Sequence, residues 1–335
     1  MSSVSEGRFL SSSVSFLTPN PLRATLLTDD GVPLEAVYEP CTAGAGAAGS
    51  GAGTRAGNGA RTDTAMVVAH GFTGHLDRPA VRRAARVFSQ RAAVITFSFR
   101  GHGRSGGRST VGDREVLDLA AAVAWARSLG HRRIITVGFS MGGSVVLRHG
   151  ALYTADPAGK SVRDSPRDSV QNLIRDSTAV RAAECAECQV PALERHAEGH
   201  AEGHAEAHAD AVVAVSAPAR WYYRGTAPMR RLHWVVTRPT GRLVGRYGFR
   251  TRIADEDWDP VPLSPVGAVP LIAPAPLLIV HGDQDPYFPL DHPRMLAEAA
   301  GEGGADLWLE RGMGHAENAS DETLLTRIAD WAAAT

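Results

Sequence analysis

A strand-like run leads directly into a serine between two glycines, and then into a helix-like run. Residues 133–137 are apolar and β-branched, residues 138–143 read Gly-Phe-Ser-Met-Gly-Gly, and residues 144–149 have helical character. A sharp turn between a strand and a helix strains the backbone of Ser140 and exposes its hydroxyl, while flanking glycines avoid collisions with neighbouring segments. The helix also directs its first N–H groups at the turn. The pattern therefore predicts a nucleophilic serine.

Short apolar runs alternate with amphipathic runs on both sides of this turn. The runs predicted to be strands are 66–69, 93–98, 133–137, 211–216, 276–280 and 306–309, and those predicted to be helices are 79–90, about 114–129 and 321–334. Strands that are apolar on both faces favour a mostly parallel, doubly wound sheet covered by helices on both sides. Residues 22–39 predict an N-terminal β-hairpin that turns at Asp29-Asp30-Gly31. We expect a single α/β domain over residues 1–335.

Three segments interrupt this pattern. Residues 41–64 are almost entirely Gly, Ala, Ser, Thr and Arg, which predicts a flexible loop. Residues 153–210 predict a low-complexity, His-rich insertion, and residues 219–270 carry aromatics, arginines and prolines without clean periodicity. The last segment lies between two predicted strands, where a small lid over the serine is expected.

The His-rich insertion raises the question of a metal site. It contains histidines four residues apart and a Cys-x-x-Cys pair, namely His196, His200, His204, His208, Cys185 and Cys188. On a helix the four imidazoles would share one face, where Zn²⁺ or Ni²⁺ could bind. Gly199 and Gly203 weaken such a helix, and structural zinc sites have tighter ligand spacing. We therefore favour an expanded repeat in a loop and predict no metal.

Composition excludes several classes of partner. The 335 residues have a formal net charge of −1, which gives no general reason to expect nucleic acid or an anionic membrane. No apolar run is long enough to span a bilayer, and the N-terminus lacks a secretory pattern. Three cysteines are too few for a disulfide framework and fit a reducing compartment. The sequence thus predicts a cytoplasmic protein.

A serine nucleophile requires a base, and the base requires a carboxylate to orient it. In a doubly wound sheet, reactive groups gather at the carboxyl ends of the strands. The strand at 276–280 is followed by a segment that contains Asp283 and Asp285, and the strand at 306–309 is followed by Gly314-His315. The serine, a carboxylate and His315 thus occur in the chain order typical of such enzymes. From the residues alone, either Asp283 or Asp285 could be the carboxylate that orients His315.

Four motifs together resemble the α/β-hydrolase fold superfamily, in particular its esterase, lipase and serine-aminopeptidase-like branch. They are His70-Gly71-Phe72-x-Gly74, Gly138-x-Ser140-x-Gly142, His281-Gly282-x-x-Asp285 and Gly314-His315. The resemblance covers about residues 22–40, 65–152, 211–218 and 271–335. It implies a Ser140, His315 and Asp285 triad, with Asp285 preferred over Asp283 by family spacing. It also implies an oxyanion hole made by the N–H groups of Phe72 and Met141, and no cofactor. The loop 99–105 matches a family loop expected to be structural.

The predicted lid segment bears on the substrate. Its aromatic residues offer apolar surface for an acyl group, and we place His75, Trp221, Tyr222 and Tyr287 in the substrate pocket. Its arginines either attract an anionic substrate or form a solvated face, of which we favour the second.

The sequence thus predicts a serine hydrolase that cleaves a carboxylic ester or related acyl bond of a small molecule through an acyl-enzyme. Because fold does not fix substrate, the same triad also suits a thioesterase, a peptidase, a C–C hydrolase or an acyltransferase. In another class altogether, the chain could be a non-catalytic binding or metal-sequestering protein on a hydrolase scaffold.

Overall fold

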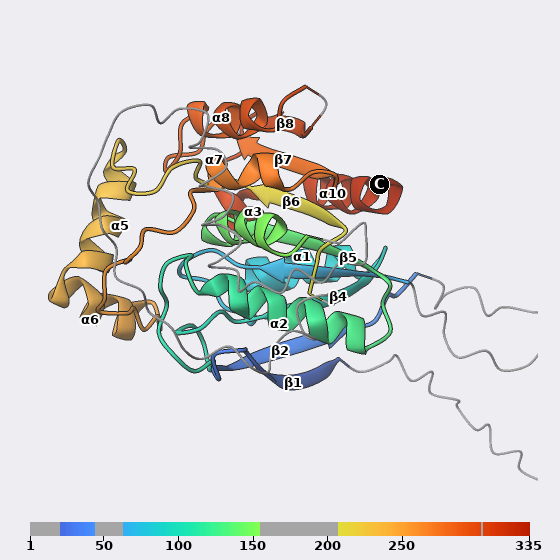
Figure 1. The fold of residues 1–335 in the computed structure, drawn as a ribbon, viewed down its shortest axis with the longest axis horizontal. Helices are drawn as coiled ribbons and strands as arrows, with labels where there is room; N and C mark the ends of the chain where they lie inside the picture. The colour runs from blue at the N-terminus through green and yellow to red at the C-terminus, as the bar shows by residue number, and fades with distance from the viewer. Residues whose placement is uncertain (1–20, 44–62, 155–206, 303) are drawn as a thin grey trace, which may run out of the picture.

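The computed structural model describes residues 21–43, 63–154, 207–302 and 304–335. Within these residues one eight-stranded sheet runs through the molecule in the order β1-β2-β4-β3-β5-β6-β7-β8 (Figure 1). The strands are β1 (Leu22–Leu27), β2 (Pro33–Glu39), β3 (Thr64–Ala69), β4 (Ala93–Phe97), β5 (Arg133–Phe139), β6 (Ala211–Val215), β7 (Leu277–Gly282) and β8 (Asp306–Glu310). Strand β2 is antiparallel to β1 and β4, whereas β3 to β8 pair in parallel.

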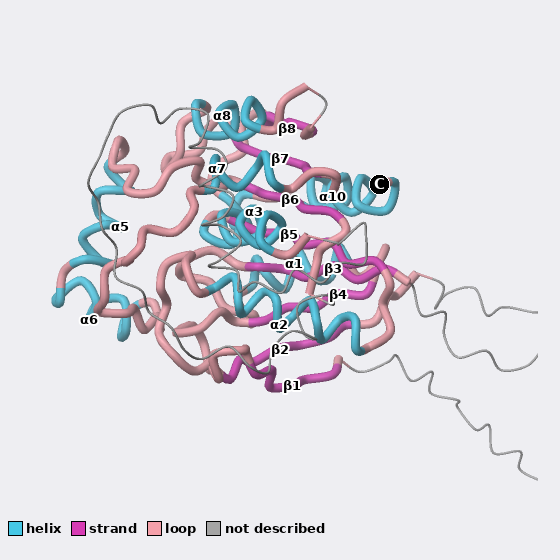
Figure 2. Tube along the Cα trace, viewed as in Figure 1, coloured by secondary structure: helices cyan, strands magenta, loops and turns pink. Residues whose placement is uncertain are grey.

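Helices cover both faces of this sheet (Figure 2). Helices α1 (Pro79–Phe88) and α10 (Glu322–Ala334) pack on one face, and α2 (Glu115–Ser128), α3 (Met141–Leu152) and α8 (Asp291–Ala299) pack on the other.

The central strand β3 shows why two cores form. Successive side chains of a strand point to opposite faces. Val67 therefore packs with Leu119 of α2, while Met66 and Val68 pack with Phe88 of α1. All five side chains are fully buried, and each such burial stabilises the fold by on the order of 1.5–3 kcal/mol. The predicted mostly parallel, doubly wound α/β fold is thus confirmed, as is the N-terminal hairpin formed by β1 and β2.

Two predicted insertions lie mainly outside the described residues. Of the loop predicted at 41–64, residues 44–62 are not described, and Thr64 already belongs to β3 because it pairs with Arg133. Of the insertion predicted at 153–210, residues 155–206 are not described. The cysteines and histidines at Cys185, Cys188, His196, His200 and His204 fall there, so the metal question stays open for them.

The last residues of the predicted second insertion, 207–210, are held by hydrogen bonds. Arg127 of α2 donates hydrogen bonds to the carbonyl oxygen of His208, at 3.1 Å, and to the carboxylate of Asp210, at 2.7 Å. Asp210 in turn accepts from the backbone N–H of Ile134 at 2.6 Å. These contacts guide the chain into β6, and no sequence periodicity could have revealed them.

The segment 219–270, predicted to form a lid, contains helices beyond the carboxyl ends of the strands (Figure 1). Helices α5 (Ala227–Thr237) and α6 (Pro239–Gly248) pack on each other, and α7 (Pro265–Ala268) and the 3-10 turn η1 (Val269–Leu271) return the chain to β7. Proline in the first turn suits α5 and α6, because the first N–H groups of a helix have no intrahelical acceptor. Among the described residues no helix is both long and apolar enough to cross a membrane.

Candidate active site

Ser140 occupies a strained turn between β5 and α3. Its φ is +53° and its ψ is −113°, a conformation that residues with side chains rarely adopt. A Cβ atom at Gly138 would lie 2.1 Å from the carbonyl oxygen of Gly142, and one at Gly142 would lie 2.2 Å from that of Ala69. The two glycines therefore let β5, α3 and β3 meet closely enough to form the turn. The N–H of Ser140 donates to the carbonyl oxygen of Val215 at 2.9 Å, which ties the turn to β6.

The structure brings Ser140, His315 and Asp285 together from three separate strand ends. His315 Nε2 lies 2.8 Å from Ser140 Oγ, and His315 Nδ1 lies 2.7 Å from Asp285 Oδ2. Both distances are those of hydrogen bonds. Hydroxyl, imidazole and carboxylate thus form one continuous chain.

The carboxylate at the end of this chain is fixed and buried. Asp285 Oδ1 accepts hydrogen bonds from the backbone N–H groups of Tyr287, at 2.8 Å, and Phe288, at 3.1 Å. Burial raises the pKa of Asp285, but the bond to His315 and these two N–H groups outweigh burial and lower it overall. The side chain therefore remains an acceptor for the His315 Nδ1–H.

Asp283 has a different role in the same loop. Its Oδ1 accepts from the backbone N–H of Gly312 at 2.6 Å and so joins the loop after β7 to the loop after β8. Of the two carboxylates left open by the residues alone, Asp285 is the one beside His315.

The loop from His70 to Phe72 is held from three sides. His70 Nε2 accepts from the N–H of Phe99 at 3.0 Å, so its Nδ1 carries the proton and donates to the carbonyl oxygen of Gly71 at 2.7 Å. Burial lowers the pKa of His70 well below its usual value, which keeps this imidazole neutral. Glu317 accepts from the N–H of Gly71 at 3.2 Å, and His102 Nε2 donates to the carbonyl oxygen of Phe72. Both histidines are completely buried.

Two residues near the site carried no prediction. Glu317, in the short helix α9 (Ala316–Ala319), is 6% exposed and holds the His70–Phe72 loop through Gly71. Ser216 follows β6, and its Oγ accepts from the N–H of Ala316 at 3.0 Å, next to His315. The sequence could have indicated both residues as part of the site, because Ser216 directly follows a predicted strand and Glu317 lies two residues after His315.

An apolar cavity of about 420 Å³ lies over Ser140. Its floor includes Phe72, Met141 and Val111, and the segment 219–270 supplies most of the remaining wall. The volume is within the range of small-molecule sites. Five residues of α5 at helical spacing line the wall, namely Met229, Leu232, His233, Val236 and Thr237.

The predicted pocket residues divide into two pairs. Trp221 and Tyr222 line the cavity and pack against Trp258, with ring centroids 5.0 and 5.4 Å apart. His75 and Tyr287 are not among the residues that line the cavity. The ring of Tyr287 lies against that of His315, with centroids 4.3 Å apart. His75 sits instead beside Gly103, in the loop predicted to be structural.

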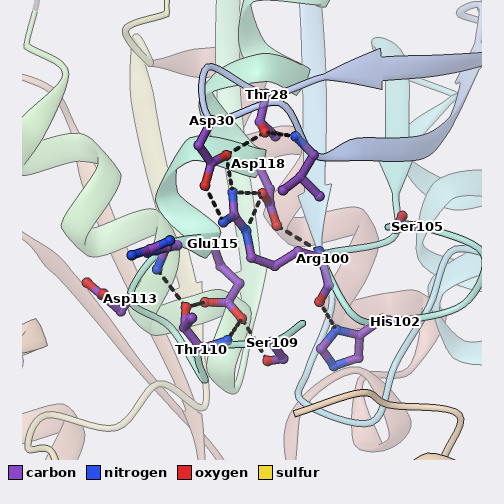
Figure 3. A network of polar contacts seen from close by, with 12 residues as sticks. Thr28, Asp30, Arg100, His102, Ser105, Ser109, Thr110, Asp113, Glu115 and Asp118 are labelled. Atoms are coloured by element: carbon purple, nitrogen blue, oxygen red, sulfur yellow. Dashed lines mark hydrogen bonds and ion pairs between the residues drawn. The ribbon is translucent and has the colours of Figure 1, made fainter. Parts of the chain in front are cut away.

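That structural loop centres on a buried arginine (Figure 3). Arg100, 2% exposed, donates to Asp118 of α2 at 2.8 Å and to Asp30 of the β1–β2 turn at 2.7 and 2.9 Å. Burial lowers the pKa of Arg100, but the two carboxylates outweigh burial and raise it overall. In the same view Glu115 accepts from both Ser109 Oγ and Thr110 Oγ1 at 2.7 Å. Because Ser109 and Thr110 line the cavity, the network fixes part of its wall.

Among the described residues no group of three His, Cys, Asp or Glu side chains is arranged to hold a metal ion. The site itself offers a hydroxyl, an imidazole, a carboxylate and the backbone N–H groups around them.

Comparisons with known proteins agree with this geometry. The fold resembles the esterase Pf2001 of Pyrococcus furiosus with a TM-score of 0.57 at 18% identity, covering 93% of this chain and 91% of that one. The α/β hydrolase GrgF from Penicillium sp. sh18 gives a TM-score of 0.57 at 15% identity, covering 93% and 98%. At these identities the likeness concerns the fold alone. A family model described as the alpha/beta hydrolase fold matches residues 64–316. The chain belongs to the α/β-hydrolase fold family.

Proposed function

We propose that this protein is a serine hydrolase that cleaves a carboxylic ester of a small molecule through an acyl-enzyme. The observation that carries the proposal is the continuous chain of 2.8 and 2.7 Å contacts from Ser140 through His315 to Asp285, beneath an apolar cavity. The family and its esterase-like neighbours support hydrolysis in general, and the ester is our inference.

In the proposed reaction, Ser140 Oγ attacks the acyl carbon while its proton passes to His315 Nε2. Asp285 holds the imidazole through Nδ1–H and stabilises its charged form. The N–H groups of Phe72 and Met141 stabilise the negative oxygen of the tetrahedral intermediate. Support for this assignment comes from the position of both residues on the cavity wall beside Ser140.

The intermediate collapses as His315 gives its proton to the leaving alcohol, which departs and leaves Ser140 acylated. A water molecule then attacks the acyl carbon while His315 takes its proton, and the carboxylic acid is released with Ser140 restored. These groups supply every proton transfer and all the charge stabilisation, so the proposed reaction needs no cofactor.

The substrate is inferred from the cavity. Its wall is mainly aromatic and aliphatic, with Arg220, Arg224, Glu256 and Asp257 also on its lining. Two basic and two acidic groups give no net preference for a charged substrate, which supports an uncharged, apolar acyl group. A thioester or amide would use the same chain of groups, and a panel of esters, thioesters and aminoacyl amides distinguishes them. A cytoplasmic location stays a prediction.

The decisive experiment compares Ser140→Ala with Ser144→Ala. Ser144 also lines the cavity, but its Oγ donates to the carbonyl oxygen of Met141 at 2.7 Å and does not contact His315. With p-nitrophenyl esters, Ser140→Ala should lower kcat by roughly 10⁴–10⁶-fold, whereas Ser144→Ala should stay within about tenfold of the parent. A Ser140→Ala protein that retains its circular dichroism spectrum and the parent rate would disprove the mechanism.

A further inference from the structure

Helix α6 buries its small residues and exposes its large apolar ones. Its glycines face inward, because a Cβ at Gly241 would lie 2.4 Å from the carbonyl oxygen of Trp234 in α5, and Gly245 is also buried. Its large apolar residues face outward instead, with Leu243 56% exposed, Val244 45% and Tyr247 77%. A surface helix normally buries such side chains. This arrangement leaves an apolar outer face without a cover in the described part of the chain.

Helix α5 extends this face. While Met229, Leu232, His233 and Val236 line the cavity, a second set at the same spacing, Ala227, Arg230, Arg231 and Trp234, lines a shallow outer groove. Val235 of α5, Val244 of α6 and Phe249 complete that groove. We call the exposed side chains Arg231, Trp234, Leu243, Val244, Arg246, Tyr247 and Phe249 the cap surface. Among the described residues it holds five of the ten large apolar side chains that are exposed, namely Trp234, Leu243, Val244, Tyr247 and Phe249.

The charge of this region differs sharply from that of the whole chain. Residues 219–253 contain nine arginines and no Asp, Glu or Lys, although the formal net charge of the protein is −1. Several of these guanidinium groups are exposed and have no carboxylate within ion-pair distance in the described residues, namely Arg224, Arg230, Arg231, Arg238, Arg246 and Arg250. Their described contacts are with carbonyl oxygens and a ring, as where Arg230 donates to the carbonyl oxygen of Gly225 at 3.1 Å and Arg246 lies over the ring of Tyr247.

We propose that the cap surface binds the surface of an anionic phospholipid bilayer. An arginine-rich helical face that also presents Trp, Tyr, Phe and Leu can insert its apolar side chains among acyl chains while its guanidinium groups contact phosphates. Exposed apolar patches of this kind mark interaction sites. The density of unpaired positive charge selects an anionic lipid surface over a neutral one.

This docking would also place the cavity close to lipid. Helix α5 separates the two, since one of its faces lines the cavity and the other forms part of the cap surface. An ester dissolved in the bilayer would then lie near the wall that α5 supplies. The binding itself does not depend on the proposed hydrolysis.

The test is co-sedimentation of the full-length protein with vesicles at physiological ionic strength. One set contains equal parts of phosphatidylcholine and phosphatidylglycerol, and the other contains phosphatidylcholine alone. The variants are Arg231→Glu/Arg246→Glu and Trp234→Ser/Tyr247→Ser. A matched control, Arg82→Glu/Arg132→Glu, changes the net charge equally at two exposed arginines outside the cap surface.

We expect the parent and the matched control to bind the anionic vesicles and to leave the neutral ones unbound. Reversing the two cap arginines should lower the partition coefficient by roughly thirtyfold or more, since each basic residue near an anionic surface contributes a factor of about five. The double serine variant should also bind more weakly. Both variants should hydrolyse a soluble ester at the parent rate, and Ser140→Ala should bind vesicles normally.

Three outcomes would overturn the proposal. The parent could fail to bind anionic vesicles, or it could bind both vesicle types equally. Light scattering could also reveal a stable dimer that the two cap variants dissociate, which would make the cap surface an interface between copies of this chain. None of these outcomes bears on the hydrolysis, which the Ser140 experiment tests separately.

Discussion

The loops at the strand ends and the α5–α6 region above them differ in which side chains they bury and which they expose. In the loops, Asp285, His70 and Arg100 are polar or charged, yet each is buried or fixed by several hydrogen bonds. In α5 and α6, large apolar and arginine side chains face outward. Buried polar groups require specific partners, whereas exposed groups do not. The loops therefore tolerate little change, and the helices above them can vary in what they recognise.

The largest expected effect concerns the carboxylate of the loops. Asp285→Asn keeps one oxygen for the N–H groups of Tyr287 and Phe288 and places an NH2 donor where Oδ2 faced His315 Nδ1, so the imidazole adopts the wrong tautomer and kcat should fall by roughly 10⁴-fold. Asp283→Asn, two residues away, keeps an oxygen to accept from the N–H of Gly312 and should change kcat less than about threefold. Steady-state kinetics on one soluble ester measures both. Equal losses in the two variants would contradict the assignment of Asp285.

The second prediction compares how much a buried ion pair and an exposed one contribute to the free energy of unfolding. Arg100→Met leaves Asp118 and Asp30 without their shared cation and should lower the free energy of unfolding by about 3–5 kcal/mol. Arg108 pairs with Asp255 at 2.8 Å between the strand-end loops and the segment 219–270, but both side chains are exposed. Arg108→Met should therefore cost about 1 kcal/mol or less.

Urea unfolding of both arginine variants provides the measurement. If Arg100→Met were no more destabilising than Arg108→Met, the network in Figure 3 would not support the loops as described.

The smallest expected effect is a change in kcat/KM caused by substitutions in α5 and α6. Leu232 of α5 lines the cavity, so Leu232→Trp should reduce its volume and lower kcat/KM for a long p-nitrophenyl ester by about tenfold relative to the acetate. Leu243→Trp on the outer face of α6 should leave this ratio unchanged, because Leu243 is not part of the cavity wall. Ratios of kcat/KM across a series of chain lengths test the pair. A change of the same size in both variants would mean that the cavity does not select the acyl group.

Much of the fold and of the candidate site could be predicted because local patterns encode them. The apolar run into Gly138-Phe139-Ser140 specifies a strand followed by a tight turn, and the structure has β5 and Ser140 there. The surroundings of Tyr287 and His75 were not predictable, because a side chain's direction depends on the turn that carries it; Tyr287 packs on His315 and His75 lies beside Gly103. Helices α5 and α6 were not predicted individually, because α5 lines the cavity with one face and the outer groove with the other, and α6 turns its glycines inward and its apolar residues outward.

The sequence by itself determined the order of the strands along the chain and the serine and histidine proposed to react, since these depend on periodicity and on short motifs. Only the tertiary structure decided that Asp285 lies beside His315 while Asp283 joins two loops, and that Glu317 and Ser216 support the site. Those contacts join residues far apart in the chain. Their partners are set by how the strands of the sheet align and by the volume left between the loops, which no local pattern contains.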